Sequence, residues 1–110
     1  MKKFILLYNG PATPPEEMTK EQIDKVMTGW KAWYEKAGDA VVDMGAPMGN
    51  GMALKDDGTP GEPTLLSGYT VVQVEDKDAL HELVKDHPFL SDNDGKFMLE
   101  AFELLPSPGM

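Results

Sequence analysis

The sequence predicts an α+β domain of the ferredoxin-like type, with its elements in the order βαββαβ. Four short stretches rich in apolar and β-branched residues are typical of strands, and two longer stretches carry apolar residues at helical spacing. Their order along the chain is that of a split βαβ unit, in which two helices cover one face of an antiparallel sheet. With 110 residues, the chain is expected to form one domain spanning residues 1–110.

The first strand and the first helix have the clearest boundaries. Residues 3–8 form a nearly continuous apolar run that Asn9-Gly10-Pro11 closes, which favours a strand in the centre of a sheet. Thr19 and Gln22 form a capping-box signature for the start of a helix, and Gly38 is a stop signal. The apolar stripe of this helix consists of Ile23, Val26, Met27, Trp30, Trp33, Tyr34 and Ala37. We interpret its aromatic members as packing residues rather than as a ligand-stacking site.

The remaining elements are expected from valine-rich runs, helical spacing and turn residues. They are a strand at 40–44, a glycine-rich loop at 45–51, a short strand at 52–54 that Asp56-Asp57-Gly58 reverses, an exposed loop at 59–64, a strand at 68–74, a helix that Asp76 caps, a polar turn at 91–95, a strand at 97–105 and an irregular tail at 106–110. The second helix is expected to carry Leu80, Leu83 and Val84 on one face.

Apolar residues on both faces of the predicted sheet indicate a homodimer. Ile5, Leu7, Val41, Val71, Leu99 and their alternates give apolar character to both faces, whereas the helices cover only one of them. A bare apolar face is costly in water. We therefore expect two copies to pack sheet against sheet as a dimeric α+β barrel and to enclose a hollow that His87 borders.

The composition excludes several classes of function. Ten lysines, no arginine and nineteen acidic residues give a net charge of -9, so nucleic acid is not an expected partner. The absence of cysteine removes disulfides, thiolate nucleophiles and zinc-thiolate sites. No stretch approaches the roughly 20 apolar residues of a membrane span, and the apolar run at the start is too short for a signal peptide. We expect a cytoplasmic protein with no membrane partner, no metal and no cofactor.

His87 is the first candidate for catalysis. Pro88 disfavours helical backbone at the preceding residue, so His87 should leave the second helix at a fixed corner. Imidazole titrates near neutrality and suits general acid or base work. The alternative is a structural histidine that binds the last helix carbonyls. Asp43, at the end of a valine-rich strand, shares an alternation face with Val41 and is a candidate partner that would orient the imidazole; the alternative is an exposed acid that accepts loop amides.

Six further residues are candidates for substrate binding. The glycine-rich loop lets backbone amides approach a ligand closely, but it lacks the Gly-Lys-Ser/Thr of a phosphate-binding loop. Tyr8, Ser67 and Tyr69 offer hydroxyl groups at strand ends. The predicted substrate-binding residues are Tyr8, Gly45, Pro47, Gly49, Ser67 and Tyr69.

The sequence resembles the YCII-related domain family over essentially its whole length. The matching pieces are Lys3-Phe4-Ile5-Leu6-Leu7-Tyr8, Trp30-Lys31-Ala32-Trp33, Gly38-Asp39-Ala40-Val41-Val42-Asp43, Gly45-Ala46-Pro47-Met48-Gly49, Ser67-Gly68-Tyr69-Thr70-Val71-Val72, Asp86-His87-Pro88-Phe89-Leu90 and Phe102-Glu103-Leu104-Leu105-Pro106. The resemblance implies a dimeric α+β barrel and a histidine-aspartate pair in a cleft, carried here by His87 and Asp43. One relative removes chloride from a chlorinated hydroquinone. The Asp-Gly-Pro-Phe run of one branch is absent here, and Asp86-His87-Pro88-Phe89 only echoes it.

Two functions are compatible with these observations. The first is a small cofactor-independent enzyme that acts by proton transfer on an aromatic or lactone-like molecule, with His87 as acid or base and Asp43 as its partner. The second is a non-catalytic dimeric module that binds a small molecule or a protein, with His87 in a structural role.

Overall fold

The computed structural model describes residues 1–10, 15–90 and 97–106. Its strands are β1 (Lys2–Asn9), β2 (Val41–Asp43), β3 (Ala53–Leu54), β4 (Pro60–Gly61), β5 (Leu66–Val74) and β6 (Met98–Glu103). Its α-helices are α1 (Lys20–Ala37) and α2 (Lys77–Val84), and short 3₁₀ turns occupy Pro15–Glu17, Gly38–Ala40 and Pro88–Leu90. The predicted turn at 91–95 and most of the tail lie outside the described residues.

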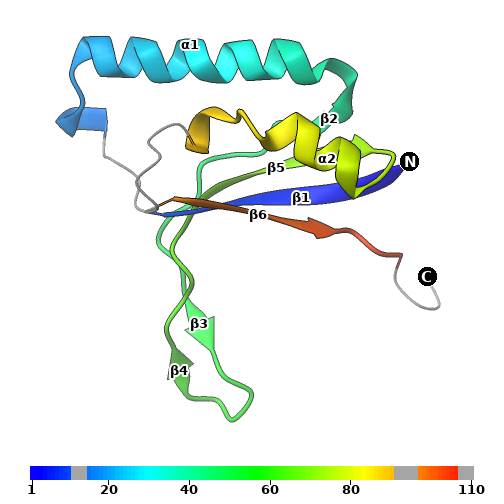
Figure 1. The fold of residues 1–110 in the computed structure, drawn as a ribbon. Helices are drawn as coiled ribbons and strands as arrows, with labels where there is room; N and C mark the ends of the chain where they lie inside the picture. The colour runs from blue at the N-terminus through cyan, green and yellow to red at the C-terminus, as the bar shows by residue number, and fades with distance from the viewer. Residues whose placement is uncertain (11–14, 91–96, 107–110) are drawn as a thin grey trace.

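The main sheet has the strand order β2-β5-β1-β6, and every neighbouring pair is antiparallel. Both helices lie on one face of it (Figure 1). This is the ferredoxin-like arrangement that the sequence predicted. The capping box at Thr19 and the cap at Asp76 are both present, so the starts of both helices are confirmed.

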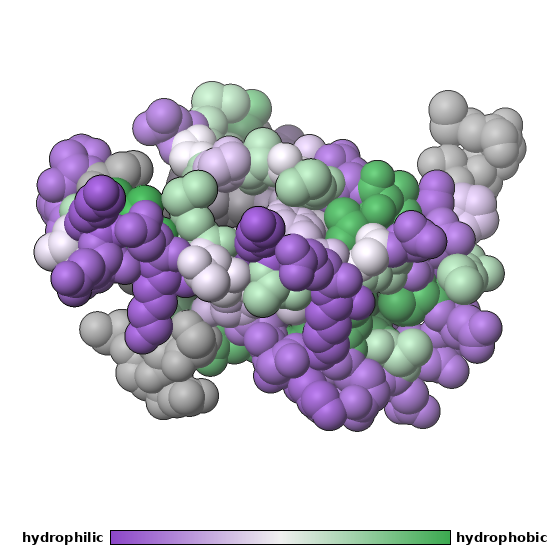
Figure 2. All heavy atoms as spheres, turned by 90° about the horizontal axis from the view of Figure 1, so that it is seen from above, coloured by the Kyte–Doolittle hydropathy of each residue, from purple (hydrophilic) through white to green (hydrophobic). Residues whose placement is uncertain are grey.

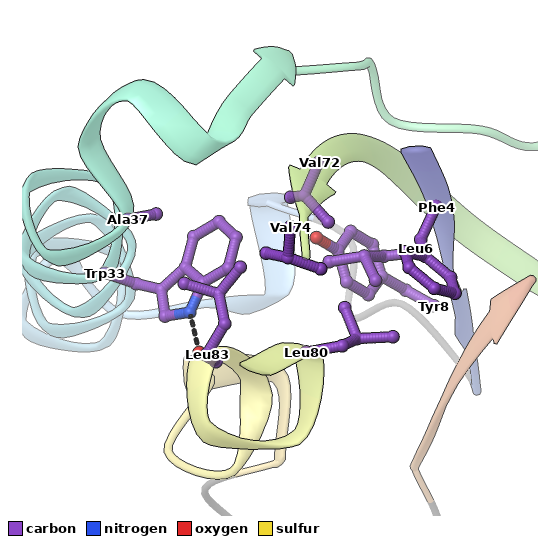
Figure 3. Close-up of a cluster of buried hydrophobic side chains, with 9 residues drawn as sticks. All are labelled: Phe4, Leu6, Tyr8, Trp33, Ala37, Val72, Val74, Leu80 and Leu83. Atoms are coloured by element: carbon purple, nitrogen blue, oxygen red, sulfur yellow. Dashed lines mark hydrogen bonds between the residues drawn. The ribbon is translucent and has the colours of Figure 1, made fainter. Parts of the chain in front are cut away.

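The core lies between the helices and the sheet. Alternate residues of β1, namely Phe4, Leu6 and Tyr8, point into it, as do Val72 and Val74 of β5. The helices contribute Trp33, Ala37, Leu80 and Leu83 (Figure 3). Trp33 also donates a hydrogen bond of 2.9 Å from Nε1 to the carbonyl of Leu83, which ties α1 to α2. Seen from the helix side, the outer surface is largely hydrophilic, with apolar residues between the charged ones (Figure 2).

The opposite face of the sheet, which we call the open face, is covered by neither helix (Figure 1). The register places Ile5 opposite both Val71 and Phe102, and Leu7 opposite Tyr69. Phe102 leaves 53% of its surface exposed. The apolar character that the sequence predicted for both faces is therefore present.

Two details of the middle region correct the sequence analysis. Residues 59–64, expected as a loop, include β4, which pairs with β3 in a separate two-stranded ribbon. The register of β2 against β5 shifts between Val41 and Asp43, so Asp43 lies opposite Val71 on the open-face register and not on the face of Val41. A bulge of this kind leaves no simple trace in an alternating sequence.

Candidate functional site

His87 lies at the corner between α2 and the 3₁₀ turn Pro88–Leu90. Its backbone amide donates to the carbonyl of Val84 at 3.0 Å, and its own carbonyl accepts from the amide of Leu90 at 2.9 Å. Pro88 cannot continue the helix, so the chain turns there, as predicted. The side chain does not project into solvent, because His87 is only 1% exposed. His81, in contrast, is an exposed residue of α2.

Both ring nitrogens of His87 have hydrogen-bond partners. The amide of Phe89 donates to Nδ1 at 3.1 Å, and Nε2 lies 3.1 Å from the hydroxyl oxygen of Tyr8. Because an amide can only donate, Nδ1 is the acceptor, and in the neutral ring the proton is on Nε2. Burial lowers the pKa of His87 from 6.5 to about 4, and the charge of Asp86 acts in the opposite direction with a smaller effect. At neutral pH, His87 is therefore an uncharged ring that donates to Tyr8.

The chain of hydrogen bonds continues from Tyr8 to Thr70 on β5. Its hydroxyl lies 2.7 Å from Oγ1 of Thr70, and Thr70 in turn donates to the carbonyl of Met44 at 3.3 Å. Since Tyr8 accepts from His87, its own proton goes to Thr70, and the chain of bonds has one direction. Burial raises the pKa of Tyr8 to about 12, although the bond to Thr70 acts the other way. The phenol therefore stays protonated at physiological pH.

Aromatic rings enclose this polar group. The ring centroid of His87 lies 4.3 Å from that of Trp33 and 4.7 Å from that of Trp30. Tyr8 is 5.3 Å from Trp30, edge to face, and 5.0 Å from Phe89. Such a desolvated surrounding explains why the neutral forms of the histidine and the tyrosine are favoured.

A cavity of about 570 Å³ opens beside Tyr8 between α1, the sheet and the loop after β2. Its volume is in the range of small-molecule sites. None of the described residues that line it is charged. They are Tyr8, Met18, Val26, Trp30, Tyr34, Met44, Gly45, Ala46, Pro47, Ser67, Gly68, Tyr69, Thr70, Pro88, Phe89 and Phe97.

A second, larger hollow of about 770 Å³ lies along α1 beside the Asp86–Pro88 corner. Lys25, Lys36 and Asp86 are among its lining residues, and Lys36 forms an exposed ion pair with Asp86. The hydroxyls of Tyr8 and Thr70 do not line it. We regard the smaller cavity as the candidate site, because buried polar groups converge there.

Asp43 does not line this cavity, but it holds the loop that forms one of its walls. Its carboxylate accepts from the amide of Gly45 at 2.8 Å, closing a tight turn. Gly45 has a φ of 76°, and a Cβ atom there would lie 1.7 Å from the carbonyl oxygen of Tyr69. Only glycine fits this approach. Beyond it, the Pro47–Gly68 bridge fastens the loop to the start of β5.

The structure brings together most, but not all, of the predicted site residues. Tyr8, Gly45, Pro47, Ser67 and Tyr69 line one cavity, whereas Gly49 does not. A single chain lines this cavity, on the helix side of the sheet. The expectation that His87 borders a hollow between the two sheets of a dimer is therefore wrong, because its ring is buried on the helix side behind Tyr8.

His87 and Asp43 reach the cavity indirectly. His87 lies behind Tyr8, and Asp43 is an exposed side chain that holds the loop. The hydrogen bonds that these two residues form connect each of them to other groups, so their pairing stays a prediction.

Sequence reasoning missed Trp30, Tyr34 and Thr70 as cavity residues. Trp33 does pack in the core as expected, but Trp30 and Tyr34 face the cavity and are not only packing residues. Their spacing of four places them on one side of α1. The signal for Thr70 was a hydroxyl at an inward position of a valine-rich strand, on the face that carries Tyr8.

None of the described helices is long and apolar enough to cross a bilayer. Within residues 1–10, 15–90 and 97–106, no three His, Asp or Glu residues gather in a way that could hold a metal ion.

No protein-family model and no curated protein sequence matches this chain. Among solved structures it is similar to 5-chloro-2-hydroxyhydroquinone dehydrochlorinase from Burkholderia phenoliruptrix AC1100, in complex with 2,5-dihydroxybenzoquinone. The TM-score is 0.55 at 18% sequence identity, and the match covers 96% of this chain and 95% of that chain. The two proteins therefore share a fold over nearly their whole lengths, which supports the YCII-like fold expected from the sequence.

Proposed function

We propose that the chain is a member of the YCII-related family, and that its cavity binds a neutral, flat, hydroxyl-bearing organic molecule as the substrate of a cofactor-independent enzyme. The observation that carries this proposal is the uncharged cavity, rich in aromatic residues, whose lining includes the hydrogen-bonded pair Tyr8 and Thr70. The shared fold with an enzyme whose structure holds a dihydroxybenzoquinone supports the part of the proposal that concerns a flat, hydroxyl-bearing ligand.

The lining favours a neutral ligand over an anion. A carboxylate placed among apolar side chains loses its hydration without gaining a cation, because no lysine lines the cavity within the described residues. Trp30, Tyr34 and Phe89 offer ring faces and edges to a flat molecule. Shape and charge thus select aromatic or similarly flat neutral compounds.

The hydrogen bonds favour a ligand that carries hydroxyl groups. The oxygens of Tyr8 and Thr70 each already accept one bond and donate one, and each keeps a lone pair. When the O–H of Tyr8 turns from Thr70 to a ligand oxygen, the lone pair of Thr70 is freed for a ligand hydroxyl, and this requires the Tyr8 ring to move aside because Thr70 is 0% exposed. A ligand with acceptors alone uses only half of this capacity.

Tyr8 is the group that we propose donates its proton to a substrate oxygen on which negative charge develops, and that takes a proton back when the product leaves. When its O–H turns to a substrate oxygen, Nε2–H of His87 still donates to the tyrosine oxygen and stabilises the negative charge that develops there. His87 then acts through Tyr8, and Asp43 acts by holding the loop at Gly45. In this proposal His87 and Asp43, the pair that the family resemblance implies, are positioning residues.

Calorimetric titration with hydroquinone, and with benzoate as the matched anion, tests the proposal. We expect hydroquinone to bind more tightly than benzoate, and Tyr8→Phe to weaken its binding by about tenfold, the usual worth of one lost hydrogen bond. Tyr69→Phe is the control and should bind almost as the parent does, because Tyr69 lies opposite Leu7 on the open-face register and its hydroxyl is not part of the Tyr8–Thr70 network. Tighter binding of benzoate would contradict the proposal.

A non-catalytic binding module is the alternative function, and one observation favours it. Both nitrogens of His87 are occupied, so the imidazole has no free lone pair for a bound molecule. Turnover separates the two. If a substrate screen with the parent chain finds a reaction that Tyr8→Phe abolishes, the enzyme is supported; binding that never leads to turnover supports the module.

We further propose that the functional unit is a homodimer, formed by packing two open faces against each other. The support is the apolar open face, where Ile5, Leu7, Val71 and Phe102 have no helix above them. Burial of such a surface is the main favourable contribution to association. Sedimentation velocity of the parent chain and of Phe102→Glu tests this proposal, and we expect a dimer and a monomer, respectively.

A further inference from the structure

Residues 48–66 form a narrow two-stranded projection that leaves the body on the side of the open face (Figure 1). We call it the arm. The structure assigns it to a second copy of this chain: we infer that in the homodimer proposed above each arm clasps the body of the other subunit. This inference rests on that dimer and adds a second interaction surface to it.

Backbone pairing holds the arm together at its base and toward its tip. Met48 donates to the carbonyl of Ser67 at 3.1 Å near the body, and β3 pairs with β4 through Ala53–Gly61 and Leu54–Pro60. At the tip, Lys55 donates to the carbonyl of Thr59 at 2.8 Å. The chain is extended, with a radius of gyration of 15.7 Å, whereas about 13 Å is usual for a compact domain of this length.

Apolar side chains line the arm although it projects away from the core. Met52 is 86% exposed, Leu54 is 68% exposed and Leu65 is also exposed. A two-stranded ribbon is marginally stable alone in water, so its apolar residues normally need a surface to cover. The body of the same chain does not supply that surface, because the arm points away from it (Figure 1).

The position of the arm fits a second copy on the open face. Packed sheets lie about 10 Å apart. The chain leaves the body on the side of the open face, bends at Asn50 and pairs again at Ala53 and Leu54. An arm on this side meets the flank of a subunit whose sheet packs on the open face. Two copies related by a twofold axis each present one arm and one flank.

The area of the open face, compared with that of a stable interface, also supports a contribution from the arm. Four strands spaced about 4.8 Å apart, each with about six residues at 3.3 Å, cover roughly 400 Å² in plan. A stable interface buries about 800 Å² on each partner. The open face alone provides about half of this area, and the arm supplies additional apolar surface on the same side.

Sedimentation velocity over a dilution series tests the inference with four chains. We expect the double variant Met52→Glu with Leu54→Glu to raise the Kd of the dimer by about tenfold or more, since charges would replace buried apolar contacts. Met27→Glu, an exposed methionine on α1, is the matched control and should keep the parent Kd. Phe102→Glu reports on the open face.

The outcomes distinguish the arm from the dimer itself. In one outcome, Phe102→Glu abolishes the dimer while the arm variant keeps the same Kd as the Met27→Glu control. That result would overturn the clasp but support the dimer. A monomeric parent chain would overturn both. Ligand binding in the cavity is measured separately and depends on neither.

Photo-cross-linking provides a second test, which does not depend on whether the glutamate variants fold as stably as the parent chain. The chain has no cysteine, so Leu54→Cys provides a single site for a maleimide-linked benzophenone. We expect irradiation to yield a cross-linked dimer from Leu54→Cys and none from Met27→Cys. Equal cross-linking from the two positions, or none from the arm, would contradict the clasp.

Discussion

The two faces of the sheet are built from the same strands, and they differ in what covers them. On β1, Leu6 points to the helices and is fully buried, while its neighbour Leu7 points to the open face and is only partly covered. The covered face carries a core, a hydrogen-bonded histidine and a cavity. The open face carries an apolar surface and an arm beside it. Because side chains alternate between the two faces of a strand, the same strands supply the candidate site on the helix side and the proposed dimer surface on the open face.

The difference between the faces also concerns polar groups. The buried polar residues, Thr70 and His87, both lie on the helix side, and both are satisfied by Tyr8 and by backbone groups. On the open face, the main polar contact is Asn9 donating to Glu100 at 3.2 Å. Fully satisfied buried polar groups make the helix side a specific arrangement, which is what a binding site needs.

The largest effect that separates the faces is expected from truncating the two adjacent leucines. Leu6→Ala should lower the free energy of unfolding by about 2–5 kcal/mol, because it opens a cavity in the core. Leu7→Ala should lower it less and should instead raise the Kd of the dimer. Chemical denaturation together with sedimentation checks this pair. If both variants lost the same free energy of unfolding and Leu7→Ala kept the parent Kd of the dimer, the proposed distinction between the two faces would be wrong.

Acid should weaken the covered face through His87. The pKa of this residue is about 4 in the folded chain and 6.5 in the reference state, so between these values the unfolded chain holds the extra proton. The free energy of unfolding therefore falls as the pH drops from about 6.5 to about 4, by an amount on the order of 3 kcal/mol.

Denaturation at several pH values with His87→Gln tests this effect. The variant has no imidazole at this position, so it should lose the contribution of His87 to the pH dependence. His81→Gln, at the exposed histidine of α2, is the control and should keep the parent profile. A parent profile that His87→Gln leaves unchanged would mean that the buried ring does not control acid stability.

Gly45→Ala should disrupt the wall of the cavity. A Cβ atom at this position collides with the Tyr69 carbonyl, so the loop must move, at a cost of about 1–3 kcal/mol. Gly38→Ala is the matched control, because Gly38 also has a positive φ but has open space around it. Hydroquinone binding should be lost in the first variant and kept in the second. Retained binding in Gly45→Ala would show that the wall is not part of the site.

The smallest effect concerns the helix that covers the cavity. Thr19→Ala removes the capping box of α1, which should cost about 0.5–2 kcal/mol of stability. The dimer Kd should not change, because α1 lies on the other side of the sheet. Thermal denaturation and sedimentation provide the two measurements, and a change in the Kd would contradict the separation of the faces.

The sequence was sufficient for the parts of this fold that depend on local signals. Thr19 with Gln22, Asp76 and Gly38 marked the helix ends, and the apolar runs marked β1 and β5. The bulge between Val41 and Asp43 and the pairing of β4 were missed, because both depend on contacts with a neighbouring strand.

The part of the candidate site that depends on local signals was predicted, and the part that depends on contacts between distant residues was not. Tyr8, Gly45, Pro47, Ser67 and Tyr69 were chosen as residues at strand ends and in one loop, and strand ends meet at one edge of a sheet. The bond between Tyr8 and His87 spans 79 positions. Spacing in the sequence cannot show such a contact, nor the burial that lowers the pKa of the ring.

Nitrogen NMR of His87 tests the arrangement of the site most directly. The chemical shifts of the two ring nitrogens identify which one carries the proton, and their change with pH gives the pKa. We predict a proton on Nε2, an unprotonated Nδ1, and a neutral ring down to a pH of about 4. A proton on Nδ1, or a ring that titrates near its ordinary value of 6.5, would contradict the hydrogen-bonded chain through Tyr8 on which the proposed function depends.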